Sequence, residues 1–388
     1  MLLNDFIPVD KSSAIRAFLF SLLTDDDVEV ICGSVLPEDV LSALNCLNLF
    51  GKVVEEKGGV FKISGKTKKP MSPIDCGNSA TMMHILMGIS VYLGMDLELT
   101  GDKSLMSRDH SAFSEAAKLY AGNFVDTSLA KESAQLKSFH LISMLKNGGK
   151  LYFKSRTRRN TEDLLTKMGA EIVENKNCIE VFPVERLHGY SVGIKLDPSS
   201  VFIAACAAFV FGKSFEISNI YKDDSRMTPF ILLKNAGFEI KIEEDAGSFK
   251  VSGNPVCKEA HDINVKENQV AEIIDEITFV AFMVARIGKT FTVRNASWLR
   301  NKESDRISES VKRFSLTFET KEFADGFSVS GVTKHALKGE IPHSFDHRME
   351  MLSSLIAIDS GYYFKMNDSY KISFPKFYEL FKYLKNDK

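Results

Sequence analysis

The chain has 388 residues, of which 44% are hydrophobic and 26% are charged, and its formal net charge is -2 at pH 7. This length is too great for one ordinary core, so we expect two domains. The near-zero net charge excludes a general attraction to nucleic acid or acidic membranes, and anions would need a local basic pocket.

The six cysteines are scattered along the chain without a CxxC pair. This spacing predicts neither a zinc site nor a disulfide framework, and free thiols are typical of a reducing compartment. The first residues lack the pattern of a signal peptide, and no apolar run is long enough to span a membrane. We therefore expect a cytoplasmic protein.

In chain order, short turns of polar or small residues repeatedly open apolar helices. These openings lie at residues 10–13, 77–80, 133–135, 197–200, 275–276 and 345–348. Hairpins are predicted between them, at residues 51–63, 169–181, 237–251 and 316–329. The openings recur with a mean period of about 67 residues, which indicates repeated α/β modules rather than one doubly wound sheet.

The helix predicted at residues 202–211 is apolar on nearly all sides, as expected for a helix inside a module. Six modules divide naturally into two groups of three. We therefore expect one discontinuous domain from residues 1–10 and 197–388, and a second domain from residues 11–196.

Residues 300–307 read Arg-Asn-Lys-Glu-Ser-Asp-Arg-Ile and lie between a predicted strand at 291–296 and a predicted helix from Ile307. Such a charged turn is often a solvated set of ion pairs. It can also hold phosphate or carboxylate with Lys and Arg while Glu303 moves a proton. Cations distributed among the modules favour the second interpretation, and these are Lys11, Arg16, Arg108, Lys302, Arg306 and Arg348.

Seven segments in order resemble the 5-enolpyruvylshikimate-3-phosphate synthase family along nearly the whole chain. They are Lys-Ser-Ser-Ala-Ile-Arg at 11–16, Asp-Cys-Gly-Asn-Ser-Ala-Thr at 75–81, Leu-Thr-Gly-Asp at 99–102 with Arg108, Ser-Ala-Gln at 133–135, Arg-Asn-Lys-Glu-Ser-Asp-Arg at 300–306, Asp-His-Arg-Met at 346–349, and Ser-Phe-Pro at 373–375. One such motif is weak, but seven in the family's order are specific.

The resemblance implies an α/β (α+β) fold of two similar domains. Each would have three βαβαββ modules in the enolpyruvyl transferase fold, an inside-out α/β barrel, with the active site in the cleft between the domains. It implies transfer of the enolpyruvyl group of phosphoenolpyruvate to the 5-hydroxyl of shikimate 3-phosphate, releasing phosphate through a tetrahedral intermediate, in aromatic amino acid biosynthesis. No metal or organic cofactor is expected. The expected partners are the two small substrates, without nucleic acid or membrane, and the expected state is a monomer.

By resemblance, Glu303 and Lys11 are candidates for proton transfer, and Asp275 lies by the attacking hydroxyl. The residues expected to bind phosphoenolpyruvate are Lys11, Arg108, Arg306, Arg348, His84 and Ala80. Those expected to bind shikimate 3-phosphate are Lys11, Ser12, Arg16, Ser133, Ala134, Gln135, Thr157, Asp275 and Lys302. The hydroxyl contact after the strand at 151–153 matches either Ser155 or Thr157, and Thr157 keeps the family's spacing to Thr161 and Glu162.

Four positions depart from the family pattern: Ala80 for Gly, His84 for Arg, Ala134 for Ser, and Ile372 for Lys. His84 is a cation only when it is protonated. Lys371 lies one residue before Ile372, and in a strand it would face the opposite side. A charge-assisted hydrogen bond contributes about 1.5–3 kcal/mol, so we expect weaker binding of phosphoenolpyruvate. An Ala at position 80 is associated in this family with insensitivity to glyphosate.

Other functions fit less well. The related transferase acting on UDP-N-acetylglucosamine uses a loop cysteine, and residues 100–113 contain none. A divergent relative with weak or altered activity stays an alternative. A noncatalytic anion-binding module is disfavoured because Glu303 and Asp275 would weaken simple anion binding. A nucleic-acid-binding repeat protein lacks the basic charge, and His343 and His347 beside Asp346 are more typical of structural histidines than of a metal site.

Overall fold

The computed structural model describes residues 2–33, 35–120, 122–129, 133–154, 157–245 and 247–386. The chain divides into two compact units. The N-terminal unit is Val9–Ile194, and the C-terminal unit combines Met1–Pro8 with Lys195–Lys388. The chain's start belongs to the C-terminal unit because Leu3 N–H donates to the Glu216 carbonyl at 3.2 Å.

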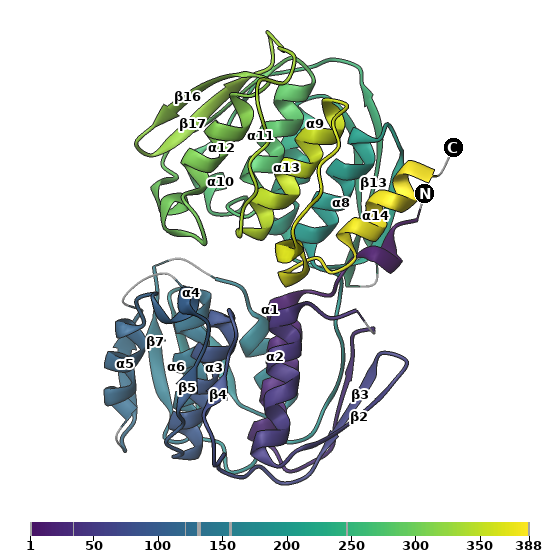
Figure 1. Ribbon diagram of the computed structural model, residues 1–388. Helices are drawn as coiled ribbons and strands as arrows, with labels where there is room; N and C mark the ends of the chain where they lie inside the picture. The colour runs from purple at the N-terminus through teal and green to yellow at the C-terminus, as the bar shows by residue number, and fades with distance from the viewer. Residues whose placement is uncertain are drawn as a thin grey trace. The chain divides into compact units, whose positions relative to one another are not determined.

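The N-terminal unit alternates helices with short strands (Figure 1). Its helices are α1 (Lys11–Leu19), α2 (Glu38–Cys46), α3 (Ala80–Leu93), α4 (Lys103–Met106), α5 (Ser111–Ala117), α6 (Ala134–Met144) and α7 (Asn160–Lys167). Its strands are β1 (Val28–Ile31), β2 (Val53–Lys57), β3 (Val60–Ser64), β4 (Ile74–Asp75), β5 (Leu99–Thr100), β6 (Val125–Ser128), β7 (Gly149–Tyr152), β8 (Ile172–Glu174), β9 (Cys178–Val181) and β10 (Ser191–Gly193).

The C-terminal unit has longer strands than the N-terminal unit. Its helices are α8 (Pro198–Val210), α9 (Thr228–Asn235), α10 (Glu267–Val270), α11 (Ile277–Arg286), α12 (Arg306–Phe314), α13 (His347–Asp359) and α14 (Phe377–Asn386). Its strands are β11 (Phe215–Tyr221), β12 (Phe238–Asp245), β13 (Ser248–Cys257), β14 (Ile263–Asn264), β15 (Thr290–Val293), β16 (Glu319–Phe323) and β17 (Gly326–Ser330). None of the helices described in either unit has the length and apolarity needed to cross a membrane.

One sheet topology recurs in both units. The four-stranded sheets have the orders β10-β1-β3-β2, β6-β7-β9-β8 and β14-β15-β17-β16. In each sheet the first two strands pair in parallel, and the other neighbours are antiparallel. The element order β6-α6-β7-α7-β8-β9 is the βαβαββ module expected from the sequence.

The other modules carry fewer strands in the described part of the chain. Strands β11, β13 and β12 form a three-stranded sheet, and β4 pairs only with β5. Described residues from 331 onward contain α13 and α14 but no named strand. The repeat is therefore visible in the helix openings throughout the chain and in complete sheets only in part of it.

The helices α8 and α11 lie inside the C-terminal unit. All thirteen residues of α8 are buried, and Ile277–Ala285 of α11 are buried as well. In the C-terminal unit, β16 and β17 lie at the edge, beyond the helices α11, α12 and α13 (Figure 1). Because a fully buried large apolar side chain contributes about 1.5–3 kcal/mol, these largely apolar helices anchor the core of the C-terminal unit.

The predicted helix openings act as N-caps. The side chains of Asp10, Ser79, Ser133, Asp197 and Asp346 accept hydrogen bonds from backbone N–H groups in the first turns of α1, α3, α6, α8 and α13. These caps satisfy donors that a helix start otherwise leaves unpaired. Glu276 differs, because its side chain does not cap α11.

The four predicted hairpins are confirmed as β2–β3, β8–β9, β12–β13 and β16–β17. Gly58 and Gly59 have φ angles of 61° and 80°, the left-handed conformation that a tight hairpin turn requires. Lys371 does not lie in a strand. Asp368–Ile372 is a 3-10 helix capped by Asn367, and Lys371 pairs with Asp368 at 2.9 Å.

Candidate active site

The predicted residues of the C-terminal unit come together at the starts of three helices. Arg306 is the first residue of α12, Arg348 is the second residue of α13, and Asp275 lies just before α11. Two aspartates cap α12 and α13, because Asp305 accepts from Ser308 N at 3.1 Å and Asp346 from Arg348 N at 2.9 Å.

Arg306 is the centre of this cluster. Its guanidinium is 2% exposed and contacts carboxylates from three separate segments. Nε donates to Asp346 Oδ2 at 2.9 Å, Nη2 to Glu303 Oε2 at 2.5 Å, and Nη1 lies 3.4 Å from Asp275 Oδ1. These carboxylates raise the pKa of Arg306 against the effect of its burial, so the site keeps a permanent cation.

Arg348 and Asp275 form the second contact of the cluster. Arg348 Nη1 donates to the backbone carbonyl of Asp275 at 2.8 Å, and Nη2 lies 3.4 Å from Oδ2 of the same residue. Within the described residues, the buried Nε of Arg348 has no hydrogen-bond partner. An N–H donor in that state suits an anionic ligand, because an unpaired buried donor is costly.

The two acids predicted to act in catalysis are ionised at neutral pH. Burial alone would raise the pKa of Asp275. Arg348, the exposed Lys302 and Arg306 lower the pKa by more than burial raises it, so it lies well below the usual range. Burial likewise raises the pKa of Glu303, while Arg306 and His347 lower it, and the net shift is downward. Both acids can therefore accept protons in this state.

A second set of charges lies around Glu276, the residue after Asp275, and the sequence motifs assign no functional role to its members. Arg226 Nη2 lies 3.5 Å from Glu276 Oε1 and 3.7 Å from Asp197 Oδ1, and Ser199 bonds to both Arg226 and Glu276. Burial raises the pKa of Glu276, and Asp275 adds to that effect. Arg226 lies outside every recognised motif, so only the three-dimensional arrangement reveals it.

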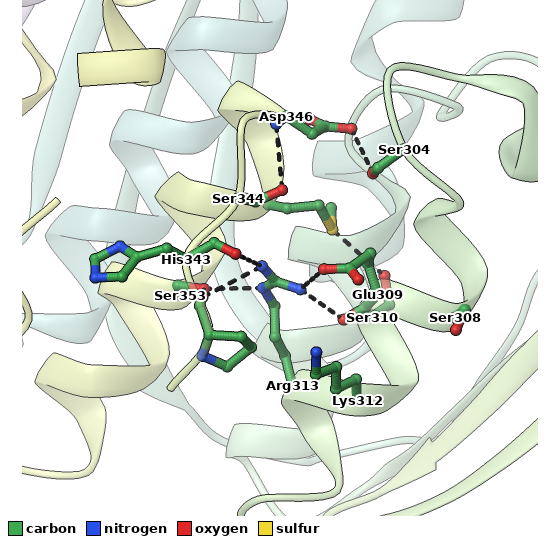
Figure 2. A network of polar contacts seen from close by, with 12 residues as sticks. Ser304, Ser308, Glu309, Ser310, Lys312, Arg313, His343, Ser344, Asp346 and Ser353 are labelled. Atoms are coloured by element: carbon green, nitrogen blue, oxygen red, sulfur yellow. Dashed lines mark hydrogen bonds and ion pairs between the residues drawn. The ribbon is translucent and has the colours of Figure 1, made fainter. Parts of the chain in front are cut away.

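A buried arginine fixes the segment that leads into α13 (Figure 2). Arg313 is fully buried, and its Nε donates to Ser353 Oγ at 2.8 Å. Its Nη2 donates to the carbonyls of Pro342 and His343 at 3.3 and 3.5 Å. These bonds hold the chain just before the cap Asp346, whose Oδ2 also accepts from Ser304 at 3.0 Å.

His343 takes part in the same support. Its Nδ1 lies 3.0 Å from Oε1 of the buried Glu350, whose other oxygen accepts from Ser344 N at 2.9 Å. Across the described ranges, no group of three or more His, Cys, Asp or Glu side chains is arranged to hold a metal ion.

In the N-terminal unit, α1 carries Lys11, Ser12 and Arg16. Lys11 Nζ bonds to Asp39 Oδ2 at 2.7 Å, a partner that the sequence did not reveal. Arg16 is 4% exposed, and its nitrogens donate to Thr161 Oγ1, Ser138 Oγ and the Ser12 carbonyl at 2.8–2.9 Å. Arg16 thus joins α1 to α6 and α7.

Two of the predicted motifs contact each other at the start of α3. Asn78 Nδ2 donates to Asp102 Oδ2 at 2.6 Å, and Arg108 Nη2 donates to Asn78 Oδ1 at 2.8 Å. Ala80, the first residue of α3, is half-buried beside this link. Asn78 and Asp102 therefore position Arg108 relative to the helix start.

His84 and Gln135 form the next contact, between α3 and α6. His84 Nδ1 lies 2.9 Å from Gln135 Oε1, and Gln135 Nε2 donates to Thr81 Oγ1 at 3.0 Å. Ser133 caps α6, and Ala134 is the first residue of that helix. His84 and Ala134, two of the departures from the family pattern, therefore lie on two helices that contact each other, α3 and α6.

Thr157 and Ser155 were the alternatives for one substrate contact. The Oγ1 atom of Thr157 is buried and has no hydrogen-bond partner among the described residues. Ser155 lies outside the residues that the structure describes. A buried hydroxyl without a partner is typical of a group that completes its hydrogen bonds with a ligand or water.

The fold is that of the enolpyruvyl transferases. The chain superposes on the enolpyruvyl transferase NikO from Streptomyces tendae with a TM-score of 0.66 and 12% identity, covering 93% of this chain and 88% of that one. It superposes on EPSP synthase from Acinetobacter baumannii with a TM-score of 0.84 and 24% identity, covering 99% and 95%. These likenesses confirm the predicted fold class.

The chain belongs to the EPSP synthase (3-phosphoshikimate 1-carboxyvinyltransferase) family, whose family model matches residues 6–116 and 113–381. Its relatives named 3-phosphoshikimate 1-carboxyvinyltransferase include that of Helicobacter pylori (strain P12), 32% identical over 96% of this chain and 95% of the relative. That of Campylobacter concisus (strain 13826) is 30% identical over 97% and 94%. The family predicted from the seven motifs is confirmed.

Proposed function

We infer that the chain is a transferase that moves the enolpyruvyl group of phosphoenolpyruvate to the 5-hydroxyl of shikimate 3-phosphate and releases phosphate. Family membership supplies the reaction. The observation that carries the inference is the contact of Arg306 with both Glu303 and Asp275, which joins a buried cation to two ionised acids.

The reaction needs proton transfer beside anion-binding groups. The methylene carbon of phosphoenolpyruvate gains a proton, while the hydroxyl oxygen forms a bond to the neighbouring carbon and loses its own proton. The tetrahedral intermediate then loses phosphate and a methyl proton, which restores the double bond. A proton donor and a proton acceptor held between cations meet these demands.

We assign proton transfer to Glu303 and Lys11, and we place Asp275 at the attacking hydroxyl. Glu303 is ionised while it bonds to Arg306. An anionic substrate that takes hydrogen bonds from Arg306 removes part of this stabilisation, so the pKa of Glu303 rises and the carboxylate can carry a proton. Substrate binding would thus prepare Glu303 to receive and return a proton.

The remaining assignments follow the family motifs. The residues proposed to bind phosphoenolpyruvate are Lys11, Ala80, His84, Arg108, Arg306 and Arg348. The residues proposed to bind shikimate 3-phosphate are Lys11, Ser12, Arg16, Ser133, Ala134, Gln135, Thr157, Asp275 and Lys302. The buried Thr157 hydroxyl and Arg348 Nε support two of these assignments, because each lacks a hydrogen-bond partner in the described structure. Since both units contribute residues, we propose that turnover requires both of them.

A cytoplasmic location and a monomeric state stay proposals. The six cysteines are free in the structure, which supports a reducing compartment. Light scattering coupled to size exclusion would test the monomer directly.

Phosphate release tests the proposed function. The purified chain is expected to release phosphate only when phosphoenolpyruvate and shikimate 3-phosphate are both present, because the enol phosphate loses its phosphate only after the shikimate hydroxyl has added to it. A coupled phosphate assay follows the rate, and mass spectrometry identifies the condensed product. Binding of both substrates without product would favour a noncatalytic anion-binding module, and release without shikimate 3-phosphate would favour an altered activity.

Inhibition by glyphosate is expected to be weak because Ala80 places a methyl group at the start of α3. Removing this methyl in Ala80→Gly should tighten inhibition about tenfold or more, since one methylene in a fitted pocket is worth about 1–3 kcal/mol. Inhibition constants measured against phosphoenolpyruvate check this. A submicromolar constant for the unaltered chain would contradict it.

A further inference from the structure

A line of polar contacts crosses the N-terminal unit from the loop before α5 to the start of α3. His110 Nε2 lies 2.9 Å from the Leu105 carbonyl oxygen, and His110 Nδ1 lies 2.9 Å from His84 Nε2. His84 Nδ1 then meets Gln135 Oε1, and Gln135 Nε2 meets Thr81 Oγ1. The imidazole of His84 is buried and stacks on Phe113 at 3.6 Å between ring centroids.

The partners at the two ends of the histidine pair determine how many protons it holds. A carbonyl oxygen only accepts, so His110 Nε2 carries a proton. The amide oxygen of Gln135 also only accepts, so His84 Nδ1 carries a second proton. The short contact between the rings needs a third. Three protons on two imidazoles give the pair one positive charge.

The neutral pair requires a different arrangement of Gln135. With two protons on the two rings, His84 Nδ1 becomes an acceptor and must face a donor. Gln135 meets this need only by turning its amide, which places Nε2 towards His84 and Oε1 towards Thr81. The charge of the pair and the orientation of Gln135 therefore change together.

The cations and anions around the pair are equal in number. The charged and titratable side chains on helices packed against α3 and on the adjoining loop are Lys11 and Arg16 of α1, Glu115 of α5, Lys137 and His140 of α6, and Arg108 and Asp109 of the loop. Asp39 and Glu162 neutralise Lys11 and Lys137. An anion bound near α3 would add negative charge and favour the protonated pair.

We propose that His84 and His110 form a proton-carrying pair that positions Gln135 for an anionic substrate. In the charged state, the Gln135 amide nitrogen points to Thr81 at the start of α3. One of its N–H bonds is donated to Thr81, and the other can be donated to the anion. The inference rests on the proposed binding of phosphoenolpyruvate at this helix start, and His110 is a positioning residue that acts through His84.

The proposal predicts a pH dependence of substrate affinity. The charged pair holds one more proton than the neutral pair, so it is favoured at low pH and lost as pH rises. The KM for phosphoenolpyruvate should therefore rise about fivefold between pH 5.5 and 8.5, because the turned Gln135 amide no longer presents an N–H to the anion. The value of kcat should change less.

The kinetic test compares KM and kcat between pH 5.5 and 8.5 in the full chain and in His110→Asn. The variant is expected to have a flatter KM profile, with His110→Gln as a second variant if the first fails to fold. His188→Asn is the matched control, since His188 is an exposed histidine of the same unit and its loss should leave the profile unchanged. Equal profiles in the His110 variants and the unaltered chain would overturn the proposal.

A second measurement does not depend on turnover. Nitrogen-15 imidazole spectra of the substrate-free chain should show one extra proton shared by His84 and His110 at low pH, and its loss should coincide with a shift of the Gln135 side-chain amide. Two neutral rings throughout the range would overturn the inference even if the chain is an active transferase. The paired titration without catalysis would uphold the pair and reject the proposed reaction.

Discussion

Replacing Glu303 by glutamine is expected to lower the rate of phosphate release by about 10²–10⁴-fold, the range typical for the loss of a positioned acid or base. Glutamine keeps the size of the side chain and can still contact Arg306, but it cannot accept or return a proton. Because Glu303 is ionised beside Arg306, the loss should fall on kcat more than on substrate binding. Steady-state rates and calorimetric titration with shikimate 3-phosphate measure the two effects separately.

Glu319→Gln is the matched control for this variant. Glu319 is an exposed glutamate at the start of β16 in the same unit, so its neutralisation should leave the rate unchanged. If Glu303→Gln kept more than about a tenth of the activity, another group would be moving the proton.

Local chemistry explains why much of the fold could be predicted. Asp10, Ser79, Ser133, Asp197 and Asp346 are short polar side chains directly before apolar runs, and each caps a helix. Capping and tight turns depend on residues within three or four positions, so the sequence contains the whole signal. The order of the seven motifs along the chain then predicted the family.

Strand content was harder to predict, because a strand needs a partner. The segment around Lys371 shows this, because a strand there would turn Lys371 to the side opposite Ile372, whereas Asn367 caps a short helix. Likewise, the described residues after Gly331 keep the helix opening at Asp346 without a complete sheet. Pairing depends on distant segments, and a periodic sequence does not fix how many strands each module retains.

In the candidate site, too, local contacts could be predicted from the sequence and long-range contacts could not. Glu303 and Arg306 lie three residues apart, and a charged turn followed by a helix was enough to predict their proximity. The contacts of Arg306 with Asp275 and Asp346 join segments 31 and 40 residues away. No local pattern encodes those distances, which is also why Arg226 and Asp39 were found only in the structure.

Asp346→Asn is expected to destabilise the C-terminal unit by about 3–5 kcal/mol, the usual cost of removing one partner of a buried ion pair. Asparagine can still cap α13. Its amide N–H₂ would replace the oxygen that accepts from Arg306 at 2.9 Å and from Ser304 at 3.0 Å. The amide N–H₂ would then face two other donors, Arg306 and Ser304. Because the side chain of Asp346 is fully buried, no water can accept hydrogen bonds from these groups instead.

Asp305→Asn provides a closely matched control. Asp305 also caps a helix with one oxygen and accepts from an arginine with the other, because Arg300 Nη1 donates to its Oδ2 at 2.8 Å. Its side chain is 38% exposed, so the same substitution should cost only about 0–1 kcal/mol. Equal losses in the two variants would show that burial around Arg306 is not what makes Asp346 important.

Denaturant unfolding followed by Trp298 fluorescence measures both variants. Trp298 is the chain's one tryptophan and lies in the 3-10 helix Ser297–Asn301 of the C-terminal unit, so it reports on the unit that contains both substitutions. A probe in that unit is needed because a chain of two compact units need not unfold in a single step.

The pH dependence of the unfolding free energy separates the contribution of the Asp346 charge from the contribution of its packing. Burial alone would raise the pKa of Asp346. Arg306 and His347 lower the pKa by more than burial raises it, so in the folded state the pKa of this carboxyl lies far below its usual range. A group with a lowered pKa stabilises the fold above its unfolded value of about 3.9, and the contribution is lost as pH falls towards the folded pKa. The difference in unfolding free energy between the unaltered chain and Asp346→Asn should therefore be constant near neutral pH and shrink below about pH 4. A difference that stayed constant in acid would mean that the amide disturbs packing, and that the charge of Asp346 contributes little to holding Arg306 in place.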